Sequence, residues 1–329
     1  MNQPNTPAFS PPTRIGFIGL GQMGYPMARN LARSGFQLMV IDANAATQQR
    51  FAADVPCEIP TNLRALGEAC RVVITMVPDG KIVREVILGK APTHGDQANS
   101  GNAANGDCVV DGLAKDTLII DMSSSSPLGT RELGEALAKR GIACIDAPVS
   151  GGVKKALDGS LAIMVGGAAS DIRRAQLILK ALGAQIFETG PLGSGHAMKA
   201  LNNYVSAAGL AAAIEGVLAG SRFGLDPEVV VRVLNASTGR NNSTENKFAQ
   251  FILSRAFNGG FGMGLMVKDL RTAMEVAHAG GTPVPLGEVC LDLWARAEKE
   301  LGGQVDHTAV ARFWEKLAGS ELHASGAKK

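Results

Sequence analysis

Several features that would point to particular classes of protein are scarce in this chain of 329 residues. Only 5% of the residues are aromatic and the net charge is +2 without a dense basic run, so nothing indicates a nucleic-acid partner. No uninterrupted apolar run reaches about 18 residues, which predicts no membrane-spanning helix and no membrane partner. The five histidines show no metal-ligand spacing, and we expect no metal site.

The cysteines and the N-terminus bear on the compartment. The five cysteines include no C-x-x-C pair, and an odd number of scattered cysteines fits reduced thiols. Residues 1–12 lack the basic region and apolar stretch of a signal peptide, so we expect a flexible tail there and another at 321–329. Together these observations predict a cytoplasmic protein.

What the chain contains divides it into two parts. In residues 13–192 short apolar strands alternate with helical patterns, which predicts a Rossmann-type, mostly parallel, doubly wound α/β sheet. In residues 193–320 helical segments follow one another without a strand between them, which predicts an all-α domain. Because 329 residues are many for one core, two domains are expected.

The start of the first part has the order of a dinucleotide site. An apolar strand at 14–19 runs into G-x-G-x-x-G, a helix follows, and a second strand closes on Asp42. Glycines allow the tight turn and a close approach of the backbone to a pyrophosphate, and the helix N-terminus supplies amide donors. The cofactor contacts expected here are Gly19, Gly21, Gln22, Met23 and Gly24.

The acid at the end of the second strand bears on the choice of cofactor. Asp42 would accept hydrogen bonds from the adenosine ribose hydroxyls and would repel a 2′-phosphate. No arginine follows it nearby. The sequence therefore favours NAD, with NADP as the alternative.

Two later segments follow strands, where ligands bind in open α/β folds. One of the serines in 123–126 is expected to cap the next helix, and the others, Ser124 among them, lie at the carboxyl end of the sheet. The run Ser150, Gly151, Gly152 exposes a hydroxyl and consecutive amides, which suits a carboxylate or oxyanion.

Glycines also open the helix that carries Lys199. Asn203 follows by four residues, so the two side chains share one helix face. The surroundings are small and apolar, which predicts a buried lysine with a movable pKa, suited to acid–base chemistry.

Three further stretches leave alternatives open. The adjacent Lys268 and Asp269 open a helix and face different directions, and an exposed helix start of mixed charge is the alternative to a functional role. The polar residues 241–243 are expected to line the substrate site. The polar, glycine-rich segment 89–112 is expected to be a mobile surface insertion, with a functional lid as the alternative.

Together and in this order, these motifs resemble the β-hydroxyacid dehydrogenase family over residues 14–318, nearly the whole chain. The family includes 3-hydroxyisobutyrate dehydrogenases and 2-hydroxy-3-oxopropionate reductases. The resemblance implies a Rossmann domain, an all-helical domain for substrate binding and oligomerisation, and a homodimer or homotetramer. It also implies hydride transfer between a nicotinamide cofactor and a small, carboxylate-bearing 3-hydroxy acid or semialdehyde.

The resemblance assigns roles to particular residues. Lys199 and Asn203 are catalytic, with Asn203 orienting the substrate. The substrate contacts are Ser150, Gly151, Gly152, Phe261 and Asp269. The remaining cofactor contacts are Met76, Val77, Ser124 and Lys268. The chain departs from the family pattern at Ser124, where threonine is usual, and in the 89–112 insertion.

Three alternatives remain at this point. An imine reductase and a glyoxylate or succinic semialdehyde reductase are the enzymatic ones, although a lysine at position 199 favours chemistry on oxygen. A non-catalytic nucleotide-binding scaffold is the third, against which the intact set of Lys199, Asn203 and Ser150 argues.

Overall fold

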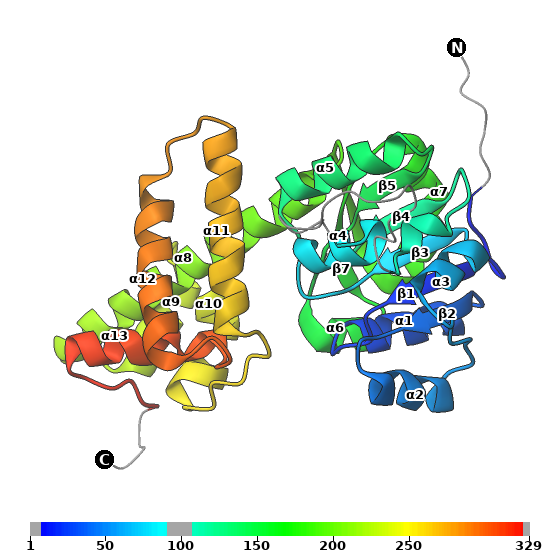
Figure 1. Ribbon diagram of the computed structural model, residues 1–329. Helices are drawn as coiled ribbons and strands as arrows, with labels where there is room; N and C mark the ends of the chain where they lie inside the picture. Colours follow the sequence, from blue (N-terminus) through cyan, green and yellow to red (C-terminus); the bar gives the residue numbers. More distant parts are fainter. Residues whose placement is uncertain (1–7, 91–106, 325–329) are drawn as a thin grey trace. The chain divides into compact units, whose positions relative to one another are not determined.

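A computed structural model describes residues 8–90 and 107–324 and divides the chain into two compact units. Unit 1 runs to Lys199 and unit 2 begins at Ala200, so the division falls inside one long helix, α8 (Ser194–Arg222). Figure 1 shows each unit: a sheet flanked by helices, and a bundle of helices.

Unit 1 is built on an eight-stranded sheet. The strand order is β2-β1-β3-β4-β5-β7-β6, with β8 beside β7. The five strands from β2 to β5 are parallel, whereas β7 is antiparallel to β5 and β6. The strands are β1 (Arg14–Ile18), β2 (Gln37–Ile41), β3 (Val72–Thr75), β4 (Leu118–Asp121), β5 (Ala143–Asp146), β6 (Val149–Ser150), β7 (Leu161–Gly166) and β8 (Gly183–Gly190).

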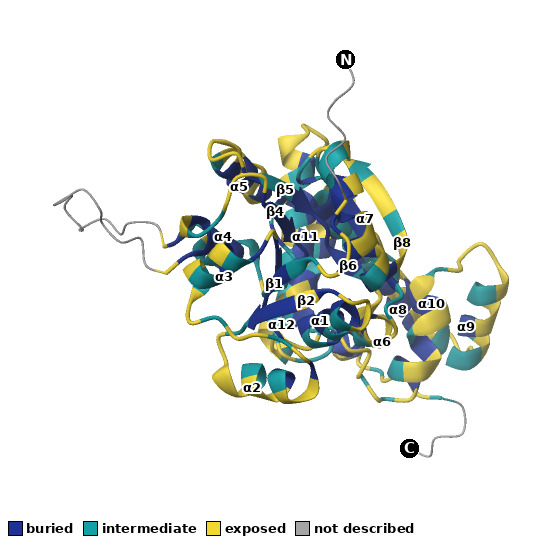
Figure 2. Cartoon of the chain, turned by 90° about the vertical axis from the view of Figure 1, so that its right-hand side faces the viewer, coloured by how far each residue is buried: buried dark blue, intermediate teal, exposed yellow. Residues whose placement is uncertain are grey.

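Helices cover both faces of this sheet. Successive residues of a strand point to opposite faces, so neighbouring strand residues pack against different helices. Val72 and Ile74 pack with the helices α1 (Gly24–Arg33), α6 (Gly152–Asp158) and α7 (Ala169–Leu182). Val73 packs on the other face, with the helices α3 (Leu63–Ala69), α4 (Gly80–Leu88) and α5 (Pro127–Ala138). Figure 2 shows buried residues concentrated on the strands, while α2 (Ala45–Asp54) is mostly exposed.

Unit 2 packs helices around a separate core. Its largest fully buried side chains are Trp294 and Phe248, and α8 contributes buried residues between Ala207 and Leu218. By length and composition α8 is apolar enough to cross a membrane. Helices in the core of a protein meet the same criterion, so this is weak evidence for a membrane span. After α8 come α9 (Pro227–Ala236), α10 (Asn242–Asn246), the π-helical η2 (Phe248–Leu253), α11 (Met263–Ala279), α12 (Pro285–Leu301), η3 (His307–Ala309) and α13 (Val310–Ala318).

The predicted fold class is confirmed: a Rossmann-type sheet is followed by an all-helical region. Asn44, Asn62 and Asp79 cap α2, α3 and α4 by accepting backbone hydrogen bonds, which explains why those helices begin where they do. The sequence pattern did not predict α3, α6 or β6, which span seven, seven and two residues.

The prediction that segment 89–112 is a mobile surface insertion is wrong for the last part of the segment. Residues 91–106 lie outside the described residues, but Asp107 accepts hydrogen bonds from the backbone of Leu63 (2.7 Å) and Arg64 (3.0 Å). The next turn, η1 (Val109–Asp111), is buried against α3 and α4. The apolar pair Val109 and Val110 follows the polar run and fills this face of the core, so the end of the segment is anchored.

The anchoring predicts a stability effect. Val109→Ala should lower the free energy of unfolding by about 2 kcal/mol, because a fully buried side chain loses two methyl groups. Urea denaturation followed by circular dichroism measures the change. Leu177→Ala, at a leucine 42% exposed on α7, is the control and should cost less. Equal losses in the two variants would contradict the anchored turn.

Candidate functional site

The turn between β1 and α1 leaves room for a ligand against its backbone. Gly19 has a φ of +99°, and a Cβ there would lie 2.3 Å from the carbonyl oxygen of Met76, so only glycine fits. A Cβ on Gly24 would lie 1.9 Å from the Gly19 carbonyl oxygen. At Gly21, by contrast, an added Cβ would meet none of the neighbouring described atoms within 4 Å. The backbone at Gly21 is therefore open to a ligand.

Helix α1 presents its N-terminus to the same turn. Met23 occupies the N-cap position without a side-chain cap, and Gln22 before it is exposed. The first amides of a helix lack intrahelical partners and carry partial positive charge, so they attract anions. The turn and the uncapped helix fit the pyrophosphate of a dinucleotide.

Asp42 ties the second strand to the glycine turn. One carboxylate oxygen, Oδ2, accepts a hydrogen bond from the backbone of Leu20 at 2.6 Å, and Oδ1 accepts one from Asn44 at 2.8 Å. The carboxylate is half-buried, and each oxygen retains a second acceptor position. This arrangement fits an acceptor for ribose hydroxyls.

The carboxyl ends of the parallel strands lie in register. Ile18 is level with Thr75, Thr75 with Asp121, and Asp121 with Asp146. The residues that follow these positions therefore meet at one edge of the sheet. The Val77 amide donates to Ser123 Oγ at 3.1 Å, which joins the loop after β3 to the serine loop after β4.

Two buried carboxylates organise this edge. Asp121 accepts hydrogen bonds from the hydroxyls of Thr75 (2.9 Å) and Ser125 (2.6 Å) and from the Ser123 amide (3.0 Å). Ser126 takes the N-cap position of α5 but makes no side-chain cap hydrogen bond, so the serine cap predicted for this helix is wrong.

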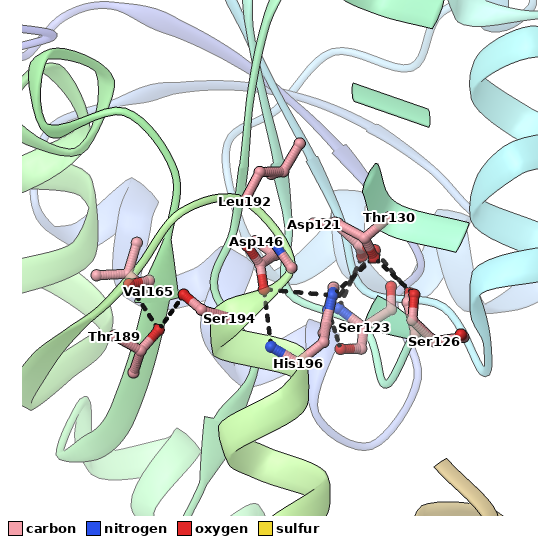
Figure 3. Close-up of polar contacts among 12 residues, drawn as sticks. Asp121, Ser123, Ser126, Thr130, Asp146, Val165, Thr189, Leu192, Ser194 and His196 are labelled. Carbon is pink, nitrogen blue, oxygen red and sulfur yellow. Dashed lines mark hydrogen bonds and ion pairs between the residues drawn. The ribbon is translucent and has the colours of Figure 1, made fainter. Parts of the chain in front are cut away.

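Asp146 fixes the first turn of α8. Its Oδ1 accepts a hydrogen bond from the Gly193 amide at 2.7 Å. Its Oδ2 accepts one from the His196 amide, also at 2.7 Å (Figure 3). A Cβ on Gly195 would lie 2.3 Å from the Met164 carbonyl oxygen and 2.9 Å from Asp146 Oδ2. The glycines of the lysine motif therefore let a buried carboxylate dock against the helix start.

The buried ring of His196 lies between the strand ends. Nε2 donates to the Ser123 carbonyl oxygen at 3.1 Å, and Nδ1 lies 2.9 Å from Thr130 Oγ1 (Figure 3). The carboxylates lie nearby, with Asp121 Oδ2 3.7 Å from Nε2 and Asp146 Oδ2 3.5 Å from Nδ1. His196 thus joins α8 to the loop after β4.

Lys199 follows His196 by three residues on α8. Its ammonium donates a hydrogen bond to the Val149 carbonyl oxygen at 2.9 Å, which places it beside the Ser150–Gly152 segment. Gly151 and Gly152 have φ values of +128° and +67°, which glycine adopts without strain. Lys199 is half-buried, less enclosed than its apolar neighbours in the sequence suggested.

Unit 2 holds the predicted site residues that follow Lys199 in the chain. Asn203 donates from Nδ2 to Oδ2 of the buried Asp269 at 2.6 Å, and Lys268 beside it is half-buried. The Phe261 amide donates to Asp306, and its ring packs edge-on against His307. In the described residues, no group of three or more histidine, cysteine or acidic side chains could hold a metal ion.

Sequence reasoning missed the parts played by His196 and Asp146. Both lie in motifs that were singled out, and the spacing of His196 from Lys199 gives a signal, because the two are three residues apart on one helix. Two of the expected lining residues 241–243 have structural positions, and Asn242 is exposed. Asn241 caps α10 and donates to the Gly209 carbonyl oxygen, whereas Ser243 is buried.

The geometry agrees with two family models that cover nearly the whole chain. Residues 14–190 match the NAD binding domain of 6-phosphogluconate dehydrogenase. Residues 193–314 match the domain described as NAD-binding of NADP-dependent 3-hydroxyisobutyrate dehydrogenase.

Individual relatives agree with the family models. A 2-(hydroxymethyl)glutarate dehydrogenase of Eubacterium barkeri is 34% identical over 93% of this chain and 96% of its own length. The mitochondrial 3-hydroxyisobutyrate dehydrogenase of Rattus norvegicus is also 34% identical, over 92% of this chain and 87% of its own. The solved structure of the Mycobacterium tuberculosis 3-hydroxyisobutyrate dehydrogenase with L-serine has a TM-score of 0.79 and 31% identity, and covers 92% of this chain and 99% of its own.

A Rossmann sheet that matches an NAD binding domain defines an oxidoreductase that uses a nicotinamide dinucleotide. The chain belongs to the β-hydroxyacid dehydrogenase family. Its role is that of a hydroxy acid or semialdehyde dehydrogenase.

The contacts of Asp146 predict a large effect from a small substitution. Asp146→Asn should lower the free energy of unfolding by about 2–4 kcal/mol, because the new amide group points an N–H at a backbone N–H and one charged acceptor is lost. Urea denaturation measures the loss. The half-exposed Asp111 gives the control Asp111→Asn, which removes the same charge at little cost. A loss no greater than in this control would count against the role of Asp146.

Proposed function

We propose that Lys199 is the general acid and base of the reaction and that Asn203 orients the substrate. The observation that carries the proposal is the 2.9 Å hydrogen bond from the Lys199 ammonium to the Val149 carbonyl oxygen. It holds a proton donor next to Ser150, Gly151 and Gly152, whose hydroxyl and amides suit a carboxylate. A substrate carboxylate bound there brings its own hydroxyl or aldehyde within reach of a lysine.

We infer the chemistry of the substrate from the compounds that the relatives' names contain. 2-(Hydroxymethyl)glutarate, 3-hydroxyisobutyrate and L-serine share the unit HO–CH2–CH–COO⁻. The proposed substrate is HO–CH2–CH(R)–COO⁻ or the matching semialdehyde. Its oxidation removes a hydride from the CH2 carbon and a proton from the hydroxyl, and leaves an aldehyde.

The roles of the chain's own residues follow from this reaction. Lys199 takes the hydroxyl proton in oxidation and returns one to the developing alkoxide in reduction, and such help typically contributes ~10²–10⁴-fold. The bond between Asn203 and Asp269 fixes the orientation of the amide that faces the substrate. When bound, the nicotinamide cofactor accepts or supplies the hydride.

We also propose which residues contact the cofactor. Gly19, Gly21, Gln22, Met23 and Gly24 bind the pyrophosphate through the turn and the start of α1. Asp42 binds the adenosine ribose and favours NAD over NADP. The nicotinamide half is bound by Met76, Val77, Ser124 and Lys268, and Phe261 borders the substrate.

We further propose that residues 13–192 serve as the dinucleotide-binding domain and residues 193–320 as the domain for substrate binding and oligomerisation. The enzyme acts in the cytoplasm as a homodimer or homotetramer, without a nucleic-acid or membrane partner. A lysine, rather than a carboxylate, at position 199 favours a hydroxy acid over an imine as substrate.

Replacing Lys199 tests the acid–base role. Lys199→Met keeps the length of the side chain and should lower kcat by about 10²–10⁴-fold, while NAD affinity measured by fluorescence titration is retained. Lys139→Met, at the exposed lysine that forms the C-cap of α5, is the matched control and should keep wild-type kcat. Near-normal turnover by Lys199→Met would contradict the assignment.

Replacing Asp42 tests the cofactor preference. Asp42→Asn should weaken NAD binding by roughly tenfold and raise the ratio of NADP to NAD affinity, because a charged acceptor and its repulsion of a 2′-phosphate are both lost. Titration with both cofactors measures the ratio. The exposed Asp158 provides Asp158→Asn as control. A wild-type preference for NADP would overturn the proposal.

A further inference from the structure

A lysine to which no role has been given lies against α8 in unit 2. Lys247 stands between α10 and η2, and its Nζ donates a hydrogen bond to Ser206 Oγ at 3.2 Å. Ser206 follows Asn203 by three residues, and positions i and i+3 share a helix face. Lys247 therefore holds its charge beside the face of α8 that carries Asn203.

The position of Lys247 is fixed by its neighbours in the chain. Its amide donates to the Ser243 carbonyl oxygen at 3.0 Å, and its carbonyl oxygen accepts from Phe251 at 3.0 Å. The next residue, Phe248, is fully buried in the core of unit 2. Because the backbone is held on both sides, the half-buried side chain has a defined direction toward α8.

No described residue places a counter-charge in contact with the Lys247 ammonium. Among residues 8–90 and 107–324, Lys247 forms no ion pair within 4.0 Å, and Asp306 is the carboxylate that acts on it from farther away. Asp306 is committed to backbone capping, since its Oδ2 accepts from the amides of Gly260 (2.7 Å) and Phe261 (3.1 Å). Its Oδ1 accepts from both the amide and the hydroxyl of Thr308.

The histidine next to Asp306 adds no compensating charge. Burial, and then the nearby Lys247, lower the pKa of His307 to about 4, so its ring is neutral at pH 7. Burial also lowers the pKa of Lys247 to about 8, and the Asp306 charge offsets only part of that effect. The cluster thus keeps a desolvated cation that an incoming anion would stabilise.

We propose that Lys247 and Ser206 bind a second anionic group of the substrate, so that R in HO–CH2–CH(R)–COO⁻ ends in a carboxylate. This inference rests on the proposed function and adds the substrate class, a dicarboxylic hydroxy acid or its semialdehyde. Asn203 and Ser206 are separated by about 4.5 Å along the helix axis, so an arm of a few carbons suffices. Of the three ammonium donors, one is used by Ser206 and two are left for oxygens of the ligand.

The test compares two substrates that differ only in R, one with R = CH3 and one with R = CH2CH2COO⁻. The wild-type enzyme should have the higher kcat/KM for the dicarboxylate. In Lys247→Met the ratio of kcat/KM for the dicarboxylate to that for the monocarboxylate should fall by roughly tenfold to a hundredfold, the range for a lost charge-assisted hydrogen bond. Lys247→Arg should restore most of the ratio, because the charge is kept.

Controls separate the possible failures. Lys299→Met removes an exposed lysine of α12 and should leave the ratio unchanged. Thermal unfolding of every variant checks that a lost ratio does not come from misfolding. A wild-type enzyme that turns over the monocarboxylate but not the dicarboxylate, or a Lys247→Met ratio equal to wild type, would overturn the role of Lys247. Turnover of neither substrate would instead overturn the proposed function.

Discussion

The carboxylate of Asp146 is the constraint on which the arrangement of the lysine helix depends. It stands at the end of β5 and accepts two backbone hydrogen bonds from the first turn of α8. Both are charge-assisted and buried, and such bonds are among the stronger ones in proteins. Since Lys199 comes one turn later, the register of β5 in the sheet decides where the ammonium lies.

Much of the sheet unit could be predicted from the sequence, for physical reasons. The parallel strands are buried on both faces, so they appear in the sequence as continuous apolar runs. The glycines of the turn after β1 have no side chains, so the backbone there is accessible to a ligand. The short α3, α6 and β6 span too few residues to establish a period. The anchored turn at Val109 was missed because the polar residues before it dominate the composition of the segment.

The sequence predicted only those features of the candidate site that lie within a single motif. The spacing of Lys199 and Asn203 follows from helix geometry, but the contact of Gly193 with Asp146 joins residues 47 positions apart. Such a contact depends on strand register, which one sequence does not reveal. Lys247 lies between a short helix and a π-helix, next to the buried Phe248, where no regular period marks a buried position in the sequence.

The boundary between the two units, inside α8, limits how this chain can be recombined with other proteins. Residues 193–199 belong to unit 1 and form hydrogen bonds with Asp146 and Val149 of the sheet, whereas the buried residues between Ala207 and Leu218 belong to the helical core. The two units therefore share one helix and cannot be separated at a loop. A chimera that takes its helical unit from another family member has to exchange sequence after Lys199, within a continuous helix whose phase must be preserved to the residue.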